Sequence, residues 1–596
     1  MFLGGFILRL IVLGRLTASP FLLPAQGDMR FYDEWAQRIL HGQFTDHLAF
    51  YGLPLYAYLL AGFYTVFGHS PFFPGLAQAA LEGGTCTVIF LLGRRVFDGP
   101  EPLPSLSKGA AIGLIAAAGW AFFVPAQTYS VILMPTAWLI FVFWFLVWKV
   151  VQFGERRPTL PACLAFGVLI GVTAMGIATI LFLIPLILAG LFLRKNFRRD
   201  FAHCCAAAAL LFLGVGLGTS PAWLHNRLVA HDPVFLSAHS GVNFWIGNNP
   251  DANGYPRFPP GLRAGQRAML ADSITAAESA AGRALKRSEV SDFWLAKAKA
   301  YIAQNPGAWL RLLLVKIANF WSAFQYDDLS IVTSLRESGV TFPGPGFGLI
   351  AAFALPGMLI AVFAIPASRW ILAAVLLHML SLLSVFVTER YRLAVVPGLL
   401  LFAAFGLWAL WRNCATGRYR RAPLYSVLLL TAVWLVTLRR GNAELWALDP
   451  YNSGLQALAA GRLDVAERKL ERAHAYVPTN AEVDLALGNL WHARGEKIKA
   501  RRFYLDALAL QPRHKSALIN LGVLALEDRQ WIAARRLFER ALAIAPNDAK
   551  THYLRARACL ALNDTACAES EIGAALRLQP VQKEFIEFRD QIRTQR

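Results

Sequence analysis

Repeated apolar runs constrain this chain more than any other feature of its sequence. About 20 apolar residues in an α-helix cross a hydrocarbon core of roughly 30 Å. The chain of 596 residues is 56% hydrophobic and only 16% charged, with a mean hydropathy of +0.44. These features predict an all-α, polytopic membrane protein. We expect about eleven spans, at 2–23, 72–93, 108–126, 131–151, 160–176, 177–193, 202–222, 347–366, 370–387, 393–411 and 423–438.

The excess of positive charge sets the expected topology. The formal net charge is +20, and much of the Lys and Arg lies in short clusters beside apolar runs. Such clusters mark cytoplasmic loops and contact anionic headgroups, which favours membrane lipid over nucleic acid as their partner. With eleven spans they all fall on one side, provided that 160–193 forms a tight hairpin of two helices. The clusters are Arg94-Arg95, Arg156-Arg157, Arg194-Lys195 with Arg198-Arg199, Arg369, and Arg412 through Arg418, Arg420 and Arg421.

This topology leaves three parts on the extracytoplasmic side. They are loop 24–71, the long loop 223–346 and everything after Arg440. A loop as long as the second is usually functional or forms a small domain. We therefore predict a membrane-embedded domain over 1–440 in a bacterial-type inner (plasma) membrane, with its active site facing outward.

The C-terminal part has a period of 34 residues. Small residues recur at the two places where helices of a repeat cross, and Pro closes each repeat, which is the tetratricopeptide signature. We predict a tetratricopeptide α-solenoid of four repeats over 447–580 and a helical extension over 581–596. The recurring positions are Ala466, Ala500, Ala534 and Ala568; Ala473, Ala507, Ala541 and Ala575; and Pro478, Pro512, Pro546 and Pro580.

Two questions about the array stay open at the level of sequence. Its concave surface suits a protein or peptide partner, but a spacer or a dimerisation unit has the same pattern. Cys559 and Cys567 lie at the end of one helix and the start of the next, so they can pair in an oxidising compartment or pack as free thiols.

An acidic stretch, Asp28 to Ala36, follows the first apolar run. Three carboxylates at a membrane boundary are costly unless they are used. A solvated turn in which Asp28 or Asp33 caps a helix is the simpler interpretation. A metal held by this loop with His47 is possible, although Asp46-His47 is a weak pattern and a solvated His fits as well. We therefore expect no cofactor.

Motifs of the membrane part resemble those of a known superfamily. Residues 35–42 and 50–56 after the first span, Asn226-Arg227, residues 241–249, and Glu389-Arg390-Tyr391-Arg392 resemble patterns of the dolichyl-phosphate-mannose protein mannosyltransferases and lipid A aminoarabinose transferases. The resemblance covers roughly residues 1–440. It implies the C-type (GT-C) glycosyltransferase fold, a polyprenyl-phosphate sugar as donor, and transfer on the external face.

The resemblance also implies a catalytic acid in the first external loop. In these families an Asp, often followed by Glu, stands about fourteen residues before a Gly, and counting back from Gly42 reaches Asp28. Met29 replaces the second acid here, while Asp33-Glu34 offers an Asp-Glu pair one turn later. Asp28 is the favoured base, with Asp33 and Glu34 as alternates.

Chemistry alone supports these residue types. A carboxylate must take the proton of an acceptor hydroxyl as the new glycosidic bond forms. The leaving lipid phosphate is best met by planar, always-charged Arg. Arg390 and Arg392 are the first candidates, with Arg227 and Arg38 behind them, although snorkelling Arg that grips headgroups is equally familiar. Candidate sugar contacts are Tyr51, Tyr56, Tyr391 and Asn248.

The sequence thus predicts a membrane glycosyltransferase acting on a protein, glycan or lipid hydroxyl. The alternative is a non-enzymatic lipid-linked sugar transporter or a membrane-anchored tetratricopeptide scaffold. Transporters place paired charges within mid-membrane helices, whereas the carboxylates here cluster in an external loop, which favours the transferase. P-loop, His-Glu-x-x-His and Cys-x-x-Cys motifs are absent, which argues against an ATP-driven pump or a zinc protease.

Overall fold

The fold is described from a computed structural model in which every regular element within the described residues is a helix. The described residues are 1–19, 21–23, 27–98, 107–153, 157–193, 200–259, 261–263, 265–417, 422–438 and 443–594. The basic clusters at Arg156, 194–199, 418–421 and 439–440 lie outside them, so their expected sidedness stays a prediction. The chain divides into two compact units, Met1–Arg439 and Arg440–Arg596.

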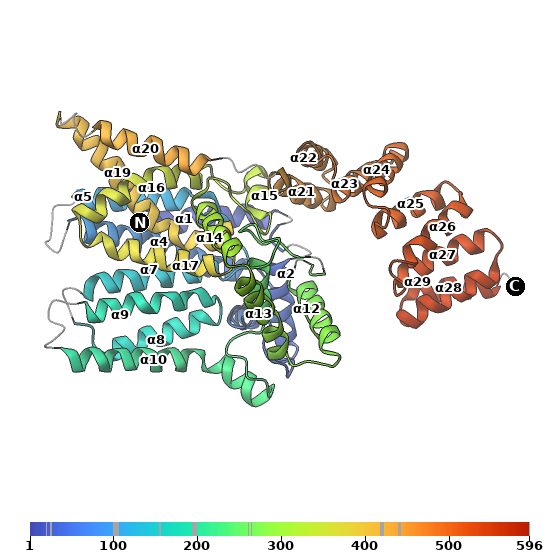
Figure 1. Cartoon of the computed structure of the whole chain (residues 1–596), viewed down its shortest axis with the longest axis horizontal. Helices are drawn as coiled ribbons and strands as arrows, with labels where there is room; N and C mark the ends of the chain where they lie inside the picture. The colour runs from blue at the N-terminus through green and yellow to red at the C-terminus, as the bar shows by residue number, and fades with distance from the viewer. Residues whose placement is uncertain are drawn as a thin grey trace. The chain divides into compact units, whose positions relative to one another are not determined.

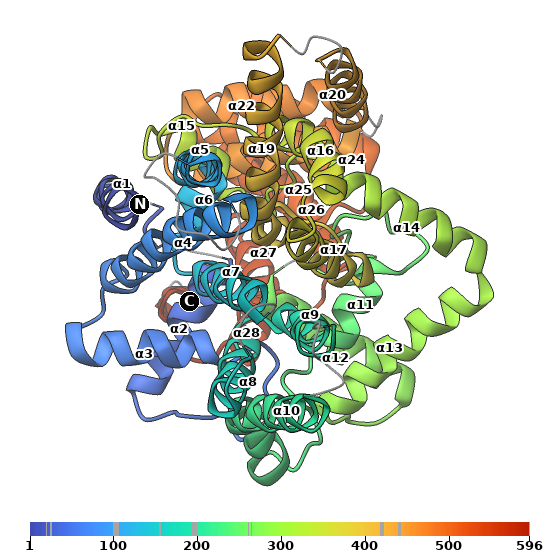
Figure 2. The same cartoon turned by 90° about the vertical axis from the view of Figure 1, so that its left-hand side faces the viewer.

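The first unit is a bundle of apolar helices with shorter helices at one end. Figure 1 shows the long helices running side by side, and Figure 2 looks along many of them. The helices are α1 (Phe2–Thr17), α2 (Asp28–Leu40), α3 (Leu55–Phe67), α4 (Phe72–Asp98), α5 (Lys108–Phe122), α6 (Val124–Tyr129), α7 (Thr136–Phe153), α8 (Leu160–Ala174), η1 (Ala178–Leu183), α9 (Ile184–Phe192), α10 (Phe201–Leu224), η2 (His225–Val229), α11 (Ser240–Gly247), α12 (Gln266–Ala281), α13 (Arg287–Gln304), α14 (Pro306–Trp321), α15 (Ile331–Glu337), α16 (Phe347–Ala364), α17 (Ser368–Ser384), α18 (Glu389–Arg392), η3 (Leu393–Val395), α19 (Val396–Ala415) and α20 (Ala422–Thr437).

Within the described residues, five helices are long and apolar enough to cross a membrane by length and composition. They are Phe72–Asp98, Thr136–Phe153, Phe201–Val229, Phe347–Ala364 and Glu389–Ala415, and six further apolar helices are shorter. The first predicted span, 2–23, contains a helix that ends at Thr17. The ambiguous stretch 160–193 folds as separate helical segments, α8 and η1 with α9.

Glycines let α8 and α10 pack at close range. A Cβ added to Gly167 would lie 2.1 Å from the carbonyl oxygen of Leu211, and one added to Gly214 would lie 2.3 Å from that of Leu164. Gly171 and Gly218 repeat the arrangement one turn further along. Small residues four apart on both helices allow the backbones to touch, as is common for packed helices in lipid. No side chain could replace them without moving the helices apart.

The short helices at one end of the bundle form a core of their own. Trp245 of α11 and Trp294 of α13 are buried there with Met269 and Ala277 of α12. In Figure 1, α12 and α13 lie with α2 at the right-hand end of the bundle. The long loop 223–346 is therefore a small helical domain beside the acidic helix α2, and its helical patch at 288–304 corresponds to α13.

The second unit is an array of helical hairpins, coloured orange to red in Figure 1. The first helices of successive hairpins, α23, α25 and α27, begin 34 residues apart. The predicted 34-residue repeat is thus confirmed, and the described unit ends with α29. The helices are α21 (Ala443–Ala459), α22 (Leu463–Tyr476), α23 (Ala481–Ala493), α24 (Lys497–Leu510), α25 (Lys515–Glu527), α26 (Trp531–Leu542), α27 (Ala549–Ala561), α28 (Thr565–Leu578) and α29 (Lys583–Thr594).

Each central hairpin is closed by a glycine against an aromatic ring. A Cβ added to Gly488 would lie 2.4 Å from a ring atom of Tyr504, and one added to Gly522 would lie 2.6 Å from the ring of Phe538. Ala534 of α26 is fully buried, as its equivalents in the other repeats are. The period exists because only small residues fit where helices cross at short distance.

We predict that residues 443–596 fold alone, because the apolar clusters of the array are built from its own helices. In this fragment Ala534→Leu should lower the free energy of unfolding by about 1–3 kcal/mol through overpacking. The neighbouring Ala533 is exposed, so Ala533→Leu should change it by less than about 0.5 kcal/mol. Denaturant unfolding followed by circular dichroism measures both. Equal effects of the two variants would contradict this packing.

Candidate functional site

Three charged side chains from distant parts of the sequence meet at the end of the bundle. Arg390 Nη1 donates to Asp28 Oδ2 at 2.9 Å, and Arg390 Nη2 lies 2.7 Å from Asp328 Oδ2. The three side chains are between 11% and 16% exposed, so the charges are largely withdrawn from solvent. We call Asp28, Asp328 and Arg390 the Arg390 cluster.

Local structure explains how each member is held. Asp28 opens α2, where a negative charge favours the N-terminal end of the helix dipole. Arg390 belongs to the short helix α18, which begins when Thr388 Oγ1 accepts a hydrogen bond from the Tyr391 amide at 3.2 Å. Asp328 precedes α15. Its neighbour Asp327 accepts hydrogen bonds from the amides of Val332 and Leu329, which fixes this turn.

Burial and neighbouring charges shape the electrostatics of the cluster. Burial raises the pKa of Asp328 above its usual range, the Arg390 cation works against that rise, and the Asp28 carboxylate adds to it. Burial also raises the pKa of Tyr32, with the charge of Asp28 contributing. Among the described residues, Asp328 Oδ1, Arg390 Nε and the hydroxyl of Tyr129 are buried without a hydrogen-bond partner. The cluster therefore has polar atoms left over for a ligand or water.

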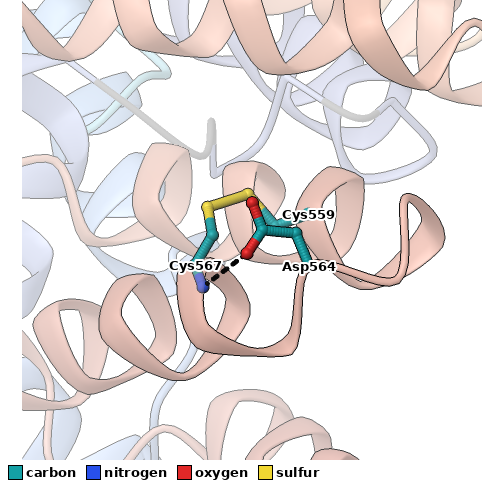
Figure 3. A group of neighbouring side chains, drawn as sticks. All are labelled: Cys559, Asp564 and Cys567. Carbon is teal, nitrogen blue, oxygen red and sulfur yellow. Dashed lines mark hydrogen bonds between the residues drawn. A yellow bond between two sulfur atoms is a disulfide. The ribbon is translucent and has the colours of Figure 1, made fainter.

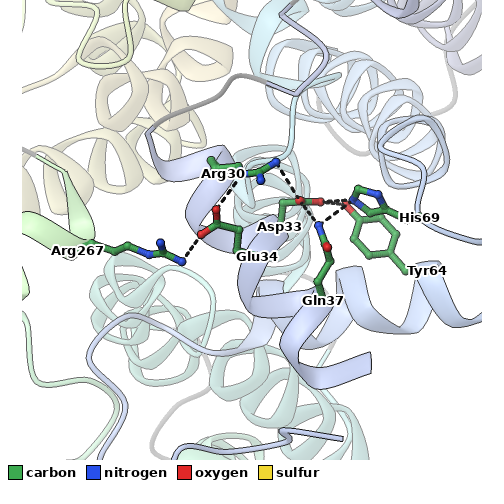
Figure 4. A network of polar contacts seen from close by, with 7 residues as sticks. All are labelled: Arg30, Asp33, Glu34, Gln37, Tyr64, His69 and Arg267. Carbon is green, nitrogen blue, oxygen red and sulfur yellow. Dashed lines mark hydrogen bonds and ion pairs between the residues drawn. The ribbon is translucent and has the colours of Figure 1, made fainter. Parts of the chain in front are cut away.

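The alternate acids, Asp33 and Glu34, belong to a different network, shown in Figure 4. The fully buried Asp33 carboxylate lies 2.6 Å from Gln37 Nε2, 2.8 Å from the Tyr64 hydroxyl and 2.8 Å from His69 Nε2. These contacts tie α2 to α3 and to the residues that follow it.

Glu34 extends this network to the next domain. Its carboxylate pairs with Arg30 at 2.9 Å and with Arg267, which stands on α12. Figure 4 shows the two acids pointing to opposite sides of α2. Both thus have positioned partners of their own, separate from the Arg390 cluster.

The two arginines of α18 lie in different surroundings. Arg392 is only 2% exposed, and its guanidinium donates to the carbonyls of Asn319, Phe320, Ser322 and Phe324 at 2.8–3.3 Å. These carbonyls stand at the end of α14 and just beyond it, where a helix leaves acceptors unpaired. The other predicted phosphate ligands, Arg38 and Arg227, are exposed. Within the described residues no contact joins either of them to the Arg390 cluster.

The predicted sugar-contacting residues also separate by position. Tyr391 lies under the Arg390 guanidinium, 5.0 Å from ring centroid to carbon, and thus adjoins the cluster. Tyr56 is buried and donates to Gln78 Oε1 at 2.7 Å. Tyr51 is buried in the core formed with α11 to α13.

Asn248 is buried within a polar network of its own. Its Oδ1 accepts hydrogen bonds from Trp309 and from the Lys316 ammonium at 3.1 Å each. Its amide donates to the carbonyls of Phe244 and Ser384. Burial lowers the pKa of Lys316 to about 7. Asn248 therefore spends its hydrogen bonds inside the protein.

Sequence reasoning missed Asp328 and Tyr129. The only signal for the first was the acidic pair Asp327-Asp328 in the second external loop, and nothing in the chain marks Tyr129. Both gain meaning only from the fold, which brings residues 28, 129, 328 and 390 into electrostatic reach of one another.

The candidate metal centre within the described residues lies elsewhere, in the array. Cys559, Asp564 and Cys567 form a compact group there, but the two cysteines are joined in a disulfide, as Figure 3 shows. Asp564 accepts a hydrogen bond from the Cys567 amide at 3.0 Å, which caps α28. Disulfide sulfurs are not thiolates, so this group is a covalent link between α27 and α28 in the fourth hairpin.

Comparisons with known proteins reach only part of the chain. No protein-family model matches the sequence. A protein described as the probable biofilm formation methyltransferase WspC of Pseudomonas putida is 36% identical over 90 residues, which are 15% of this chain and 21% of that protein. The chain thus spans about a fifth of the length of this curated relative.

Several solved structures of helical-repeat proteins are similar to a quarter or more of the chain. MamA from Desulfovibrio magneticus RS-1 is 21% identical with a TM-score of 0.25, over 26% of this chain and 87% of its own. YrrB, described as a TPR protein with an unusual peptide-binding site, is 14% identical with a TM-score of 0.23, over 30% and 88%. A thermophilic TPR protein of Thermus thermophilus is 16% identical with a TM-score of 0.23, over 31% and 96%. The class of the array is nevertheless defined by its own helices, which repeat every 34 residues.

Arg392 should matter more for stability than Arg390 does. Arg392→Ala removes the donor to four buried carbonyls, and we expect it to lower the free energy of unfolding by about 3 kcal/mol. Arg390→Ala leaves two partly exposed carboxylates that can repel each other but can also hydrate, so its effect should be smaller. Thermal unfolding of the full chain in detergent compares the two variants. A larger loss for Arg390→Ala would contradict these roles.

Proposed function

We propose that this chain is a membrane-anchored helical-repeat scaffold whose membrane unit also transfers a sugar. The scaffold part rests on the C-terminal array, whose hairpins carry their own core and a concave surface suited to a peptide. The apolar bundle of the first unit supplies the anchor, with eleven spans as the arrangement that keeps the basic clusters on one side. A protein or peptide bound by the array would then be held close to the membrane.

The enzymatic part of the proposal is carried by one observation, the pairing of Asp28 with Arg390 across the fold. A carboxylate and an arginine side by side, largely withdrawn from water and near a membrane, are the two groups that transfer from a polyprenyl-phosphate sugar requires. The resemblance of residues 1–440 to the C-type glycosyltransferases points to the same chemistry. No metal or other cofactor enters this proposal.

The step can be written with its atoms balanced. The acceptor hydroxyl oxygen forms a bond to the anomeric carbon while its proton passes to the Asp28 carboxylate. The bond from that carbon to the phosphate oxygen breaks, and its electron pair stays on the departing polyprenyl phosphate. Arg390 meets the charge that develops on this oxygen, and Tyr391 beside it is placed to contact the sugar.

Roles of the other predicted residues follow from their surroundings. Asp33 and Glu34 act by fixing α2, and Arg392 acts by holding the end of α14, so we assign none of them to the reacting atoms. Arg38 and Arg227 are exposed and suit lipid headgroups better than the cluster.

One observation favours the purely non-enzymatic scaffold or transporter. Arg390 is neutralised by two carboxylates, and a closed group of charges is also what a structural ion-pair network looks like. Membranes that contain the chain, incubated with labelled polyprenyl-phosphate sugars and a cell-envelope extract, separate the readings. Transfer of label supports the enzyme, and its absence with every donor supports the scaffold.

We predict that Asp28→Asn lowers transfer by about 100-fold or more, because general bases contribute roughly that much. Donor binding should survive. Asp33→Asn should instead lower the thermal unfolding temperature, since it disturbs a buried network, while activity per folded molecule stays within a few-fold. Full activity of Asp28→Asn together with loss in Asp33→Asn would move the base to Asp33.

The array is expected on the extracytoplasmic side. The disulfide between Cys559 and Cys567 supports this placement, because disulfides persist in oxidising compartments. The expected topology makes it the side of the Arg390 cluster as well, so a partner bound by the array would face the same compartment as the donor site.

A cysteine-accessibility experiment tests this placement. Thr479→Cys, at an exposed position of the array, should react with a membrane-impermeant maleimide in intact cells. The natural Cys414 is exposed near the end of α19 and provides the matched control, since it should react only after lysis. Labelling of both cysteines on the same side would place the array in the cytoplasm and favour the scaffold alone.

A further inference from the structure

Arg390 binds two carboxylates through different nitrogens, and this raises a chemical conflict. A base must have a free carboxylate, yet Asp28 is paired with Arg390 Nη1 at 2.9 Å. A donor phosphate needs the same cation, yet both terminal nitrogens are occupied. The conflict disappears if one of the two ion pairs opens when the donor binds.

The two ion pairs differ in how firmly their partners are connected to Arg390. The carbonyl of Tyr326 accepts a hydrogen bond from the amide of Glu389 at 2.9 Å, two residues before Asp328 and one before Arg390. Gln325 is also hydrogen-bonded to the carboxylate of Glu389. Asp328 and Arg390 therefore stand on segments that are joined by their backbones.

Asp28 reaches Arg390 from a separate element. It opens α2, whose contacts run through Asp33 to α3 and through Glu34 to α12. No backbone hydrogen bond between the described residues joins the first turn of α2 to α18. The pair formed with Asp28 is thus the one that can open without disturbing the framework of Arg390.

We propose that Asp328 is a positioning residue that retains Arg390 through Nη2 while the donor phosphate replaces Asp28 at Nη1, so that Asp28 becomes a free base only when the donor is bound. The inference rests on the proposed function, because it concerns the same donor and the same base. It also explains the buried hydroxyl of Tyr129, which lacks a partner among the described residues and can donate to the arriving phosphate. Activation of the base is in this way coupled to donor occupancy.

The inference makes opposite predictions for two carboxylates that contact the same guanidinium. Asp28→Asn removes the group that competes with the phosphate, so a polyprenyl monophosphate should bind about five-fold more tightly. Asp328→Asn removes the group that holds Arg390 in place, so the same lipid should bind about ten-fold more weakly, although a negative charge near the phosphate has been lost. Simple electrostatics predicts tighter binding for both variants.

The experiment measures binding of a short-chain polyprenyl monophosphate without sugar to the full chain in detergent, with thermal unfolding recorded for each variant. Asp272→Asn is the matched control, since Asp272 forms a similar pair with exposed Arg263 at 2.7 Å outside the cluster, and its affinity should not change. Asp328→Glu keeps the charge one methylene further out and should weaken binding only about three-fold, which covers the case in which Asp328→Asn fails to fold.

The outcomes separate this inference from the proposed function. Unchanged or tighter binding by Asp328→Asn, or by Asp328→Glu if that is the variant that folds, would overturn the positioning role while phosphate binding by the unaltered chain still supports the proposed function. Weaker binding by Asp28→Asn would overturn the exchange at Nη1. If the unaltered chain does not bind the lipid phosphate, the proposed function fails, and the positioning role fails with it.

Discussion

The ion pairs of Arg390 with Asp28 and Asp328 are the interaction on which the rest of the first unit depends. Charges that are mostly removed from water must find partners, and here the partners come from the start of α2, the turn before α15 and the short helix α18. The three segments are far apart in the sequence, so forming this cluster fixes how both external loops sit on the end of the bundle. Within the described residues, buried polar atoms of the cluster and of Tyr129 remain unpaired, which distinguishes the cluster from a fully satisfied structural network.

The surroundings of the cluster show how residues of one type acquire different roles. Asp33 lies five positions after Asp28 on the same helix, yet its carboxylate is occupied by three donors and serves to anchor α2. Arg392 lies two positions after Arg390, yet its guanidinium is used by backbone carbonyls of α14 and the turn after it. Environment, and not residue type or spacing, therefore selects Asp28 and Arg390 as the pair with chemistry to offer. The same selection removes Asn248, whose hydrogen bonds are satisfied internally.

The array follows a different physical rule, since each of its hairpins uses contacts that are local in sequence. Gly488 with Tyr504 and Gly522 with Phe538 stand sixteen residues apart within a single repeat. Local packing of this kind repeats without long-range constraints, and the disulfide between Cys559 and Cys567 closes the fourth hairpin over an equally short distance. The two units thus combine a fold that depends on distant contacts with one that depends on near neighbours.

The sequence by itself determined the helical class, the apolar character of the first unit and the 34-residue repeat, because hydrophobic composition and local periodicity act over a few turns of chain. It also pointed to Asp28, Arg390 and Tyr391 as residues with chemistry, through their types and their place beside apolar runs. Only the tertiary structure decided which of the candidate acids and arginines meet, and it added Asp328 and Tyr129, which no pattern had marked. Pairing between residues 28, 328 and 390 is a property of chain segments brought together by folding, and neither spacing nor composition records it.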